Sequence, residues 1–249
     1  MTLLQAFADA WALVAPVDCA GCGATDRAIC PTCALGLRSR PLLGELELHT
    51  STLPVTAALP YDGVARRVLL AFKEEGRTEL ARPLAGLLST AVELACRASL
   101  ADLLVPVPGS WAAAGRRGFD PVALIARRAG LVVTPALRAV RGGAEPQKSR
   151  GLADRLAAAS SAAPRWRVSP RMRGCRVVLV DDVVTSGATL RAAVLALREA
   201  GAEVAGCAAI AATPRRVGTS SIPWRFLSND DEGPDDNDAR EDYREGKEA

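Results

Sequence analysis

The chain has 249 residues, of which 49% are hydrophobic, 24% charged and only 4% aromatic, so its core must be built mainly from Ala, Val and Leu. A charged fraction of this size is ordinary for a folded protein and excludes disorder of the whole chain. The longest stretch without Asp, Glu, Lys or Arg is Leu48–Tyr61, 14 residues that include two prolines. Because a membrane-spanning helix needs about 20 apolar residues, we expect no membrane insertion.

The net charge of +3 hides an uneven distribution. Residues 230–249 hold 10 acidic and 3 basic residues, which leaves 28 basic and 18 acidic residues in 1–229. Arginine supplies 28 of the 31 cations, and its guanidinium suits bidentate binding of phosphate. Biased codon usage and solvated helix faces would explain the same excess, so the composition permits a phosphorylated ligand without demonstrating one.

The N-terminal stretch does not have the pattern of a secretory signal. No Lys or Arg precedes Arg27, and Asp9 interrupts the apolar residues. An amphipathic helix is predicted instead by the helical spacing of Leu4, Phe7, Trp11 and Val14. We therefore expect a cytoplasmic protein in a reducing compartment, where paired cysteines more often bind a metal than form a disulfide.

Residues 51–100 predict one strand and two helices. Apolar residues alternate as in a half-buried strand at Val55, Ala57, Leu59 and Tyr61. Asp62 is a candidate N-cap for the first helix, and Gly76 ends that helix in the left-handed conformation. Thr78 is expected to start the second helix.

Residues 101–214 alternate short apolar runs with helical patterns. In chain order these are a strand at Leu103–Val107, a helix opened by Asp120-Pro121, a strand at Val177–Val180, a helix with apolar residues Leu190, Val194 and Leu197 that ends at Gly201, and a strand at Val204–Ala212. The run at Val177–Val180 is typical of a strand buried on both faces of a parallel sheet. Strand, helix and strand within about 35 residues predict a βαβ unit, and hence an α/β fold with helices on both faces.

We therefore predict three parts. Residues 1–50 contain a helix and a cysteine knuckle, and residues 51–214 form the α/β domain. Residues 215–249 lose the apolar pattern and become acidic, so we expect a disordered tail.

The segment after Val177–Val180 carries the most specific pattern. It continues with Asp181-Asp182, two valines, and Thr185-Ser186-Gly187-Ala188-Thr189 at the start of a helix. Two adjacent acids at the end of a buried strand are costly unless a ribose diol, or a metal held by a ligand, binds them. Small hydroxylated residues around a glycine at a helix start bind anions. A sugar 5-phosphate fits both features, and the alternative is an ordinary βα turn capped by Asp and Thr.

This segment resembles the phosphoribosyl-pyrophosphate (PRPP) signature of type I phosphoribosyltransferases, which implies a Rossmann-like parallel sheet. Further segments resemble the ComF family, whose members combine an N-terminal cysteine knuckle with a phosphoribosyltransferase domain. These segments are Tyr61-Asp62-Gly63, Phe72-Lys73, Val105-Pro106-Val107-Pro108, Arg116-Arg117-Gly118-Phe119, and Gln147 with Arg155. The resemblance runs from about Cys19 to Pro214.

The resemblance implies a role for each matching residue. Asp181 and Asp182 would bind the ribose 2- and 3-hydroxyls, and the 5-phosphate would be held by Thr185, Ser186, Gly187, Ala188 and Thr189. A loop containing Pro106, Val107 and Pro108 would contact pyrophosphate, with Mg²⁺ bound alongside PRPP. A flap near Arg138–Arg155 would add the charges of Arg138, Arg141, Lys148, Arg150 and Arg155, unless these form only a solvated basic loop.

The implied reaction is displacement of pyrophosphate from C1 of the ribose by a nitrogen nucleophile, or its reverse. Such a site works by electrostatic positioning and needs no covalent nucleophile. His49 is the chain's single histidine and lies in a polar stretch, so no Ser-His-Asp triad is predicted. The chain departs from the family at Ser186, where many relatives have Thr, and at Asp120-Pro121, where relatives often have Asn-Gln. The pattern assigns no acceptor base.

Four of the seven cysteines form two chelating pairs, Cys19-x2-Cys22 and Cys30-x2-Cys33. Four thiolates give Zn²⁺ a closed tetrahedral shell, so a structural zinc site is predicted. The alternatives are unmetallated thiols or redox pairs. The other three cysteines, Cys96, Cys175 and Cys207, lie on helix or strand patterns and are expected to be small buried hydrophobes.

Two functions follow from these patterns. The first is a phosphoribosyltransferase or a protein that binds PRPP or a ribose 5-phosphate compound. The second is a nucleic-acid adaptor, in which the knuckle and basic surface contact single-stranded DNA or the DNA-uptake machinery, since the ComF family is associated with DNA uptake. Few rings are available to stack on bases, and Trp111 beside Arg116-Arg117 is the best aromatic–basic cluster. A redox protein is a third and weaker reading, and a homodimer is a further option.

Overall fold

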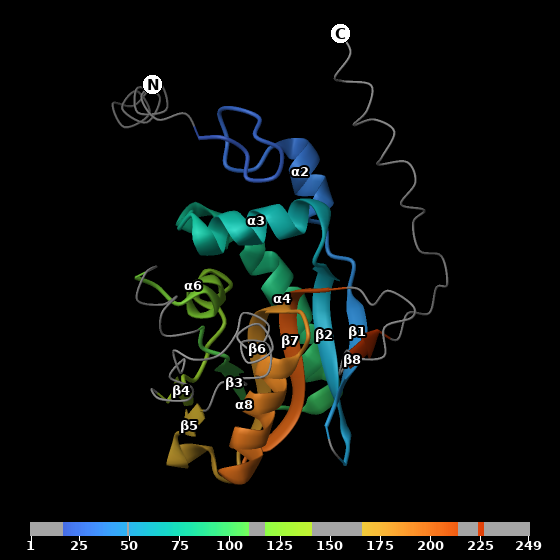
Figure 1. Ribbon diagram of the computed structural model, residues 1–249, viewed down its shortest axis with the longest axis vertical. Helices are drawn as coiled ribbons and strands as arrows, with labels where there is room; N and C mark the ends of the chain where they lie inside the picture. Colours follow the sequence, from blue (N-terminus) through green and yellow to red (C-terminus); the bar gives the residue numbers. More distant parts are fainter. Residues whose placement is uncertain (1–16, 49, 110–117, 141–165, 214–223, 227–249) are drawn as a thin grey trace, which may run out of the picture.

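The centre of the protein is a six-stranded mixed sheet in the order β3-β6-β7-β2-β1-β8 (Figure 1). The computed structural model describes residues 17–48, 50–109, 118–140, 166–213 and 224–226, and every structural statement below concerns these residues. The strands are β1 (Leu42–Glu47), β2 (Thr52–Pro60), β3 (Leu103–Pro106), β6 (Arg176–Val184), β7 (Glu203–Ala212) and β8 (Trp224–Phe226). A separate two-stranded antiparallel sheet pairs β4 (Leu137–Ala139) with β5 (Trp166–Val168).

Helices cover both faces of the large sheet. They are α2 (Pro31–Gly36), α3 (Gly63–Glu74), α4 (Ala81–Ser99), α6 (Pro121–Arg128) and α8 (Ala188–Glu199), with 3-10 turns at Thr78–Leu80 and Pro170–Met172. One buried cluster joins α3, α4 and α6 to the sheet, and a second joins α8 and β4 to its other face. Strands β3, β6, β7 and β2 run parallel, so their carboxyl ends meet at one edge.

The predicted βαβ unit is confirmed. Strand β6, helix α8 and parallel strand β7 follow one another, and the apolar stripe of α8 is buried against the sheet. Asp120 caps α6 as expected, because its Oδ1 accepts a hydrogen bond from the Ala123 N–H at 2.9 Å. Gly76, with φ +70°, follows α3 in the left-handed conformation that its helix end requires.

Several elements differ from the sequence prediction. Strand β2 is buried on both faces from Val55 to Leu59, because core clusters lie on each side of the sheet. Strand β1 was not predicted, and it pairs antiparallel with β2. Within the stretch predicted to be a disordered tail, Trp224–Phe226 form β8, which pairs with β1. Thr78 begins a 3-10 turn, and α4 starts three residues later.

The cysteine knuckle, residues 19–33, lies with α2 and α3 at the edge of the sheet where the parallel strands end (Figure 1). Among the described helices, none combines the length and the apolar character that crossing a bilayer requires. The predicted N-terminal helix, His49, Trp111 and Arg116-Arg117 lie outside the described residues.

Helix α8 offers a matched test of the buried core. Leu197 is fully buried, whereas Leu195 on the same helix is 39% exposed. Leu197→Ala removes packing atoms and leaves a cavity, so we expect it to lower the free energy of unfolding by about 2–5 kcal/mol. Leu195→Ala should change it by less than about 1 kcal/mol. Denaturant unfolding followed by circular dichroism measures both, and equal effects would contradict the assigned face of α8.

Candidate active site at the carboxyl end of the parallel strands

Strand β6 continues past the two acids to Val184, so Asp181 and Asp182 lie within the strand and not at its end as expected. The pairing of β6 with β7 explains this, since Asp181 lies opposite Ala209 and Val184 opposite Ala212. Strand β3 stops earlier, because Pro106 lies opposite Val180. The two acids therefore lie on a strand extension that rises beyond β3.

Asp181 faces α8 and the loop that precedes it. A small open pocket is lined by Asp181 together with residues 183–190, which include the whole predicted phosphate loop. Thr185, Ser186 and Thr189 are exposed there, whereas Gly187 is buried. The structure thus brings Asp181 and the predicted loop into one site.

The loop has the backbone shape that an anion site at a helix start requires. Gly187 is the N-cap of α8 and has φ +72°, a left-handed conformation that favours glycine. The Ala188 N–H donates only a long hydrogen bond, 3.4 Å, to Ser186 Oγ. Because the first N–H groups of a helix have no partner within the helix, they are available to a bound anion at this end of the dipole.

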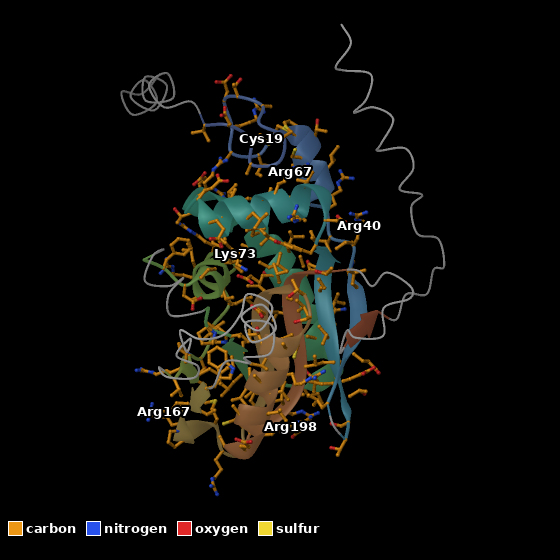
Figure 2. All side chains as sticks on the ribbon, viewed as in Figure 1. Cys19, Arg40, Arg67, Lys73, Arg167 and Arg198 are labelled. Carbon is orange, nitrogen blue, oxygen red and sulfur yellow. The ribbon has the colours of Figure 1, made fainter. Side chains whose placement is uncertain are left out.

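Asp182 points away from this pocket. It is buried, and its Oδ1 accepts a hydrogen bond from Lys73 Nζ of α3 at 2.9 Å (Figure 2). Its backbone N–H donates to Asp181 Oδ1 at 2.8 Å, which ties the two acids together through the chain. Of the two acids expected to bind one ligand, only Asp181 therefore lines this pocket.

The two acids differ in their electrostatic surroundings. Burial raises the pKa of Asp181 well above its usual range, and the neighbouring charge of Asp182 adds to this rise, while Lys73 opposes it. Burial acts to lower the pKa of Lys73, but the charge and hydrogen bond of Asp182, together with the charges of Asp181 and Tyr61, outweigh it and the pKa is raised. The charge of Asp182 also adds to the effect of burial in raising the pKa of Asp120.

The structure places the other predicted residues as follows. Val107 is buried beside the acids, and its N–H donates to the Val180 carbonyl at 2.8 Å, with Pro106 and Pro108 on either side. Arg138 is exposed on β4 opposite Arg167, in the sheet separate from the pocket. Lys148 and Arg150 lie outside the described residues, as do Arg141 and Arg155.

The contact of Lys73 with Asp182 was not predicted from the sequence. Lys73 belongs to the Phe72-Lys73 pair on which the family resemblance was drawn, but no contact was assigned to it. One further signal was present, since Lys73 is one of only three lysines beside 28 arginines.

The four knuckle cysteines meet around one point. Their Sγ atoms all lie within 4.8 Å of one another, and Cys22 Sγ is 3.7 Å from Cys30 Sγ. Tetrahedral zinc with bonds of about 2.3 Å separates its sulfur ligands by about 3.8 Å, so this donor set fits the ion. The Cys30 N–H donates to Cys19 Sγ at 3.2 Å, and the Cys33 N–H to Cys30 Sγ at 3.4 Å. These bonds orient the sulfurs toward a common centre.

The thiols of the knuckle differ in acidity. Burial acts to raise the pKa of Cys19, but backbone hydrogen bonds from Cys30, Gly21 and Cys22 outweigh it and lower the pKa to about 6. Burial and hydrogen bonds with the other cysteines raise the pKa of Cys33 to about 12. A metal bound here would have to displace the Cys33 proton.

The knuckle packs directly on α3. Arg67 Nε donates to the Gly21 carbonyl, and Val64 packs against Gly21 and Gly36. A Cβ at Gly21 would lie 2.5 Å from Cys33 Sγ, so only glycine fits there. Figure 2 shows Arg67 on the side of α3 toward Cys19, and Lys73 on the side toward the sheet.

The geometry of this site agrees with the protein family to which the chain is similar. A family model described as "Phosphoribosyl transferase domain" matches residues 116–243, about half of the chain. The chain belongs to the phosphoribosyl transferase domain family. Its mixed α/β fold with a largely parallel sheet agrees with the predicted fold class of this family.

Two known proteins are similar to this member of the family. Orotate phosphoribosyltransferase of Streptomyces avermitilis is 37% identical over 83 residues, which cover 31% of this chain and 46% of that protein. The chain thus matches just under half the length of that curated relative. A solved structure, described as the allosteric regulatory enzyme of purine biosynthesis, is 25% identical with a TM-score of 0.31, and the match covers 52% of this chain and 25% of that chain.

The raised pKa of Asp181 predicts a pH-dependent effect on stability. A carboxyl whose pKa is higher in the folded than in the unfolded protein favours folding most at low pH, and this contribution is lost as pH rises through the folded pKa. We therefore expect Asp181→Asn to raise the free energy of unfolding at pH 7 by about 1 kcal/mol, or about 2–4 °C in Tm. Asparagine keeps an oxygen for the Asp182 N–H.

The control for this prediction is Asp62→Asn. Asp62 is exposed and makes no side-chain capping bond, so its replacement should change stability by less than about 0.5 kcal/mol. Thermal unfolding from pH 4 to pH 8 should show the advantage of Asp181→Asn shrinking toward low pH. An advantage that is constant with pH would mean that ionisation of Asp181 is not its cause.

Proposed function

We propose that the protein binds PRPP, or a ribose 5-phosphate product, in the pocket at the carboxyl end of β6. The observation that carries this proposal is that Asp181 shares one pocket with residues 183–190 at the start of α8. The carboxylate can accept hydrogen bonds from ribose hydroxyls, and the loop amides and hydroxyls can hold a 5-phosphate. Membership of the phosphoribosyl transferase domain family supports the same ligand.

The reaction that we propose transfers the phosphoribosyl group from pyrophosphate to a nitrogen nucleophile. The C1–O bond to pyrophosphate breaks, the C1–N bond forms, and the nucleophile loses a proton. The loop at Thr185–Thr189 would fix the 5-phosphate, and Asp181 and Asp182 would orient the ribose ring while positive charge develops on it. Mg²⁺ bound with PRPP would supply charge to the leaving pyrophosphate.

We further propose that the chain is of the ComF type. The support is the combination of a four-cysteine knuckle with a phosphoribosyl transferase domain in one chain. The acceptor is left as a nitrogen nucleophile, because the match to the orotate enzyme covers only 46% of that protein. Three further points stay predictions, since no contact among the described residues bears on them. They are a role with single-stranded DNA or DNA-uptake machinery, a homodimer and a cytoplasmic location.

Calorimetric titration tests the ligand site. We expect PRPP with Mg²⁺ to bind in the micromolar range, about −8 kcal/mol. Asp181→Asn/Asp182→Asn removes the charges that accept the ribose hydroxyls and should weaken binding at least about a hundredfold. Asp102→Asn is the matched control, because Asp102 is an exposed acid at the opposite edge of the sheet, where it accepts the Arg176 N–H. Equal affinities of the wild type and the double variant would reject the assigned site.

We also propose that the knuckle binds one structural Zn²⁺ through Cys19, Cys22, Cys30 and Cys33. The support is the approach of the four sulfurs to one another and the closed shell that they form. The segment offers few buried apolar residues of its own, so the ion would supply much of its folding free energy.

Elemental analysis of the purified protein tests this proposal, with about one zinc per chain expected. Cys33→Ser should lose the ion, because it removes one of the two buried ligands. Cys175→Ser is the control, since Cys175 Sγ donates to the Arg171 carbonyl outside the knuckle and a hydroxyl can do the same. Zinc retained by Cys33→Ser, or absent from the freshly purified wild type, would reject the site.

A further inference from the structure

We propose that Lys73 is a positioning residue of the ligand site, which fixes the Asp182 carboxylate at the edge of the sheet so that it can serve the ribosyl ligand. This inference rests on the proposed function. Its basis is the contact between Lys73 Nζ and Asp182 Oδ1, 2.9 Å long, with the two side chains 23% and 9% exposed. A carboxylate this enclosed needs a partner to stay charged.

The position of Lys73 is set by its helix. The preceding residue, Phe72, is fully buried, and its ring centroid lies 5.5 Å from that of Phe119 at the approach to α6. One residue after Lys73 the helix ends, so the lysine stem extends from an anchored last turn. Anchoring of this kind limits where the ammonium can go, as positioning requires.

Lys73 is the cation at the centre of an acidic neighbourhood. Asp182 and Asp181 act on it electrostatically, as does Tyr61 at the end of β2. Asp120 at the start of α6 is in turn influenced by the charge of Asp182. Without the ammonium, the charge of Asp182 would act on Asp181 and Asp120 with no cation among these groups. Asp182 would then turn toward solvent or give up its charge.

A lysine suits this position better than the arginine that the chain uses elsewhere. The lysine ammonium is a compact charge on a flexible stem, whereas the arginine guanidinium is a rigid planar group whose N–H donors form a fork. The ammonium contacts Asp182 Oδ1, so the other carboxylate oxygen would be the one to accept from a ligand hydroxyl. Lys73 therefore acts on the ligand through Asp182, which distinguishes it from a residue that contacts pyrophosphate itself.

A double-variant cycle separates these two roles. PRPP with Mg²⁺ is titrated into the wild type, Lys73→Met, Asp182→Asn and the combined variant. We expect Lys73→Met to raise the Kd about tenfold, and the combined variant to bind no more weakly than Asp182→Asn alone. Lys73→Arg keeps the charge, but its planar fork can engage both carboxylate oxygens, so we expect only partial rescue, with a Kd about threefold above that of the wild type.

Two controls guard against a purely structural effect. Arg66→Met removes an exposed cation from the same helix and should leave the Kd unchanged. Thermal unfolding of each variant shows whether loss of affinity merely follows loss of stability. If Lys73→Met does not fold, the comparison of Lys73→Arg with the wild type and of the combined variant with Asp182→Asn still decides the matter.

The outcomes are distinct. An unchanged Kd for Lys73→Met overturns the positioning role while leaving the PRPP site in place. The same holds if the loss of affinity in the combined variant equals the product of the losses in the two single variants. A Kd that follows Tm in every variant also overturns it. Failure of the wild type to bind PRPP rejects the proposed function and the positioning role together.

Discussion

Neighbouring side chains of a β-strand point to opposite faces of the sheet, and this constraint governs the candidate site. Asp181 and Asp182 are adjacent in β6, so the backbone directs one toward α8 and the other toward α3. A site that needs both acids must therefore lie above the edge of the sheet, where the two faces meet. The extension of β6 beyond β3 provides this edge, since Pro106 ends opposite Val180 and leaves both acids uncovered by β3 on that side.

Helix α3 connects this edge to the cysteine knuckle. Val64 lies against Gly21 of the knuckle and Gly36 of α2, and Arg67 donates to the Gly21 carbonyl. Lys73 contacts Asp182 less than two turns after Arg67. A helix is stiff over this length, so the packing of its first half also sets the direction of its last turn. The knuckle thus belongs to the scaffold that places Lys73, even though none of its cysteines lines the pocket.

The sequence was sufficient to predict those helices and strands that are defined by a pattern of neighbouring residues. The βαβ unit was readable because β6 and β7 are continuous apolar runs around an amphipathic helix. Strand β1 was not, because its Leu42–Glu47 pattern mixes leucine with glycine and acids, and its pairing with β2 and β8 stabilises it. The Lys73–Asp182 contact joins residues 109 apart along the chain, and a pair so distant leaves no pattern in either segment. The opposite orientation of the adjacent acids was not predicted, because the sequence placed them at the end of the strand and the strand continues past them to Val184.

The burial of Asp181 has opposite effects on the stability of the folded protein and on the binding of the proposed ligand. Its carboxyl is partly buried beside the charge of Asp182, so its ionised form is disfavoured in the folded protein. In the proposed complex, a ribose diol would donate two hydrogen bonds to this carboxyl, and these would favour its ionised form. For the proposed ribosyl ligand, these hydrogen bonds would offset the cost of ionising Asp181, so the same burial that weakens the fold would favour a hydroxyl-bearing ligand over a phosphate alone. An acid on the open surface would be already satisfied by water and would discriminate less.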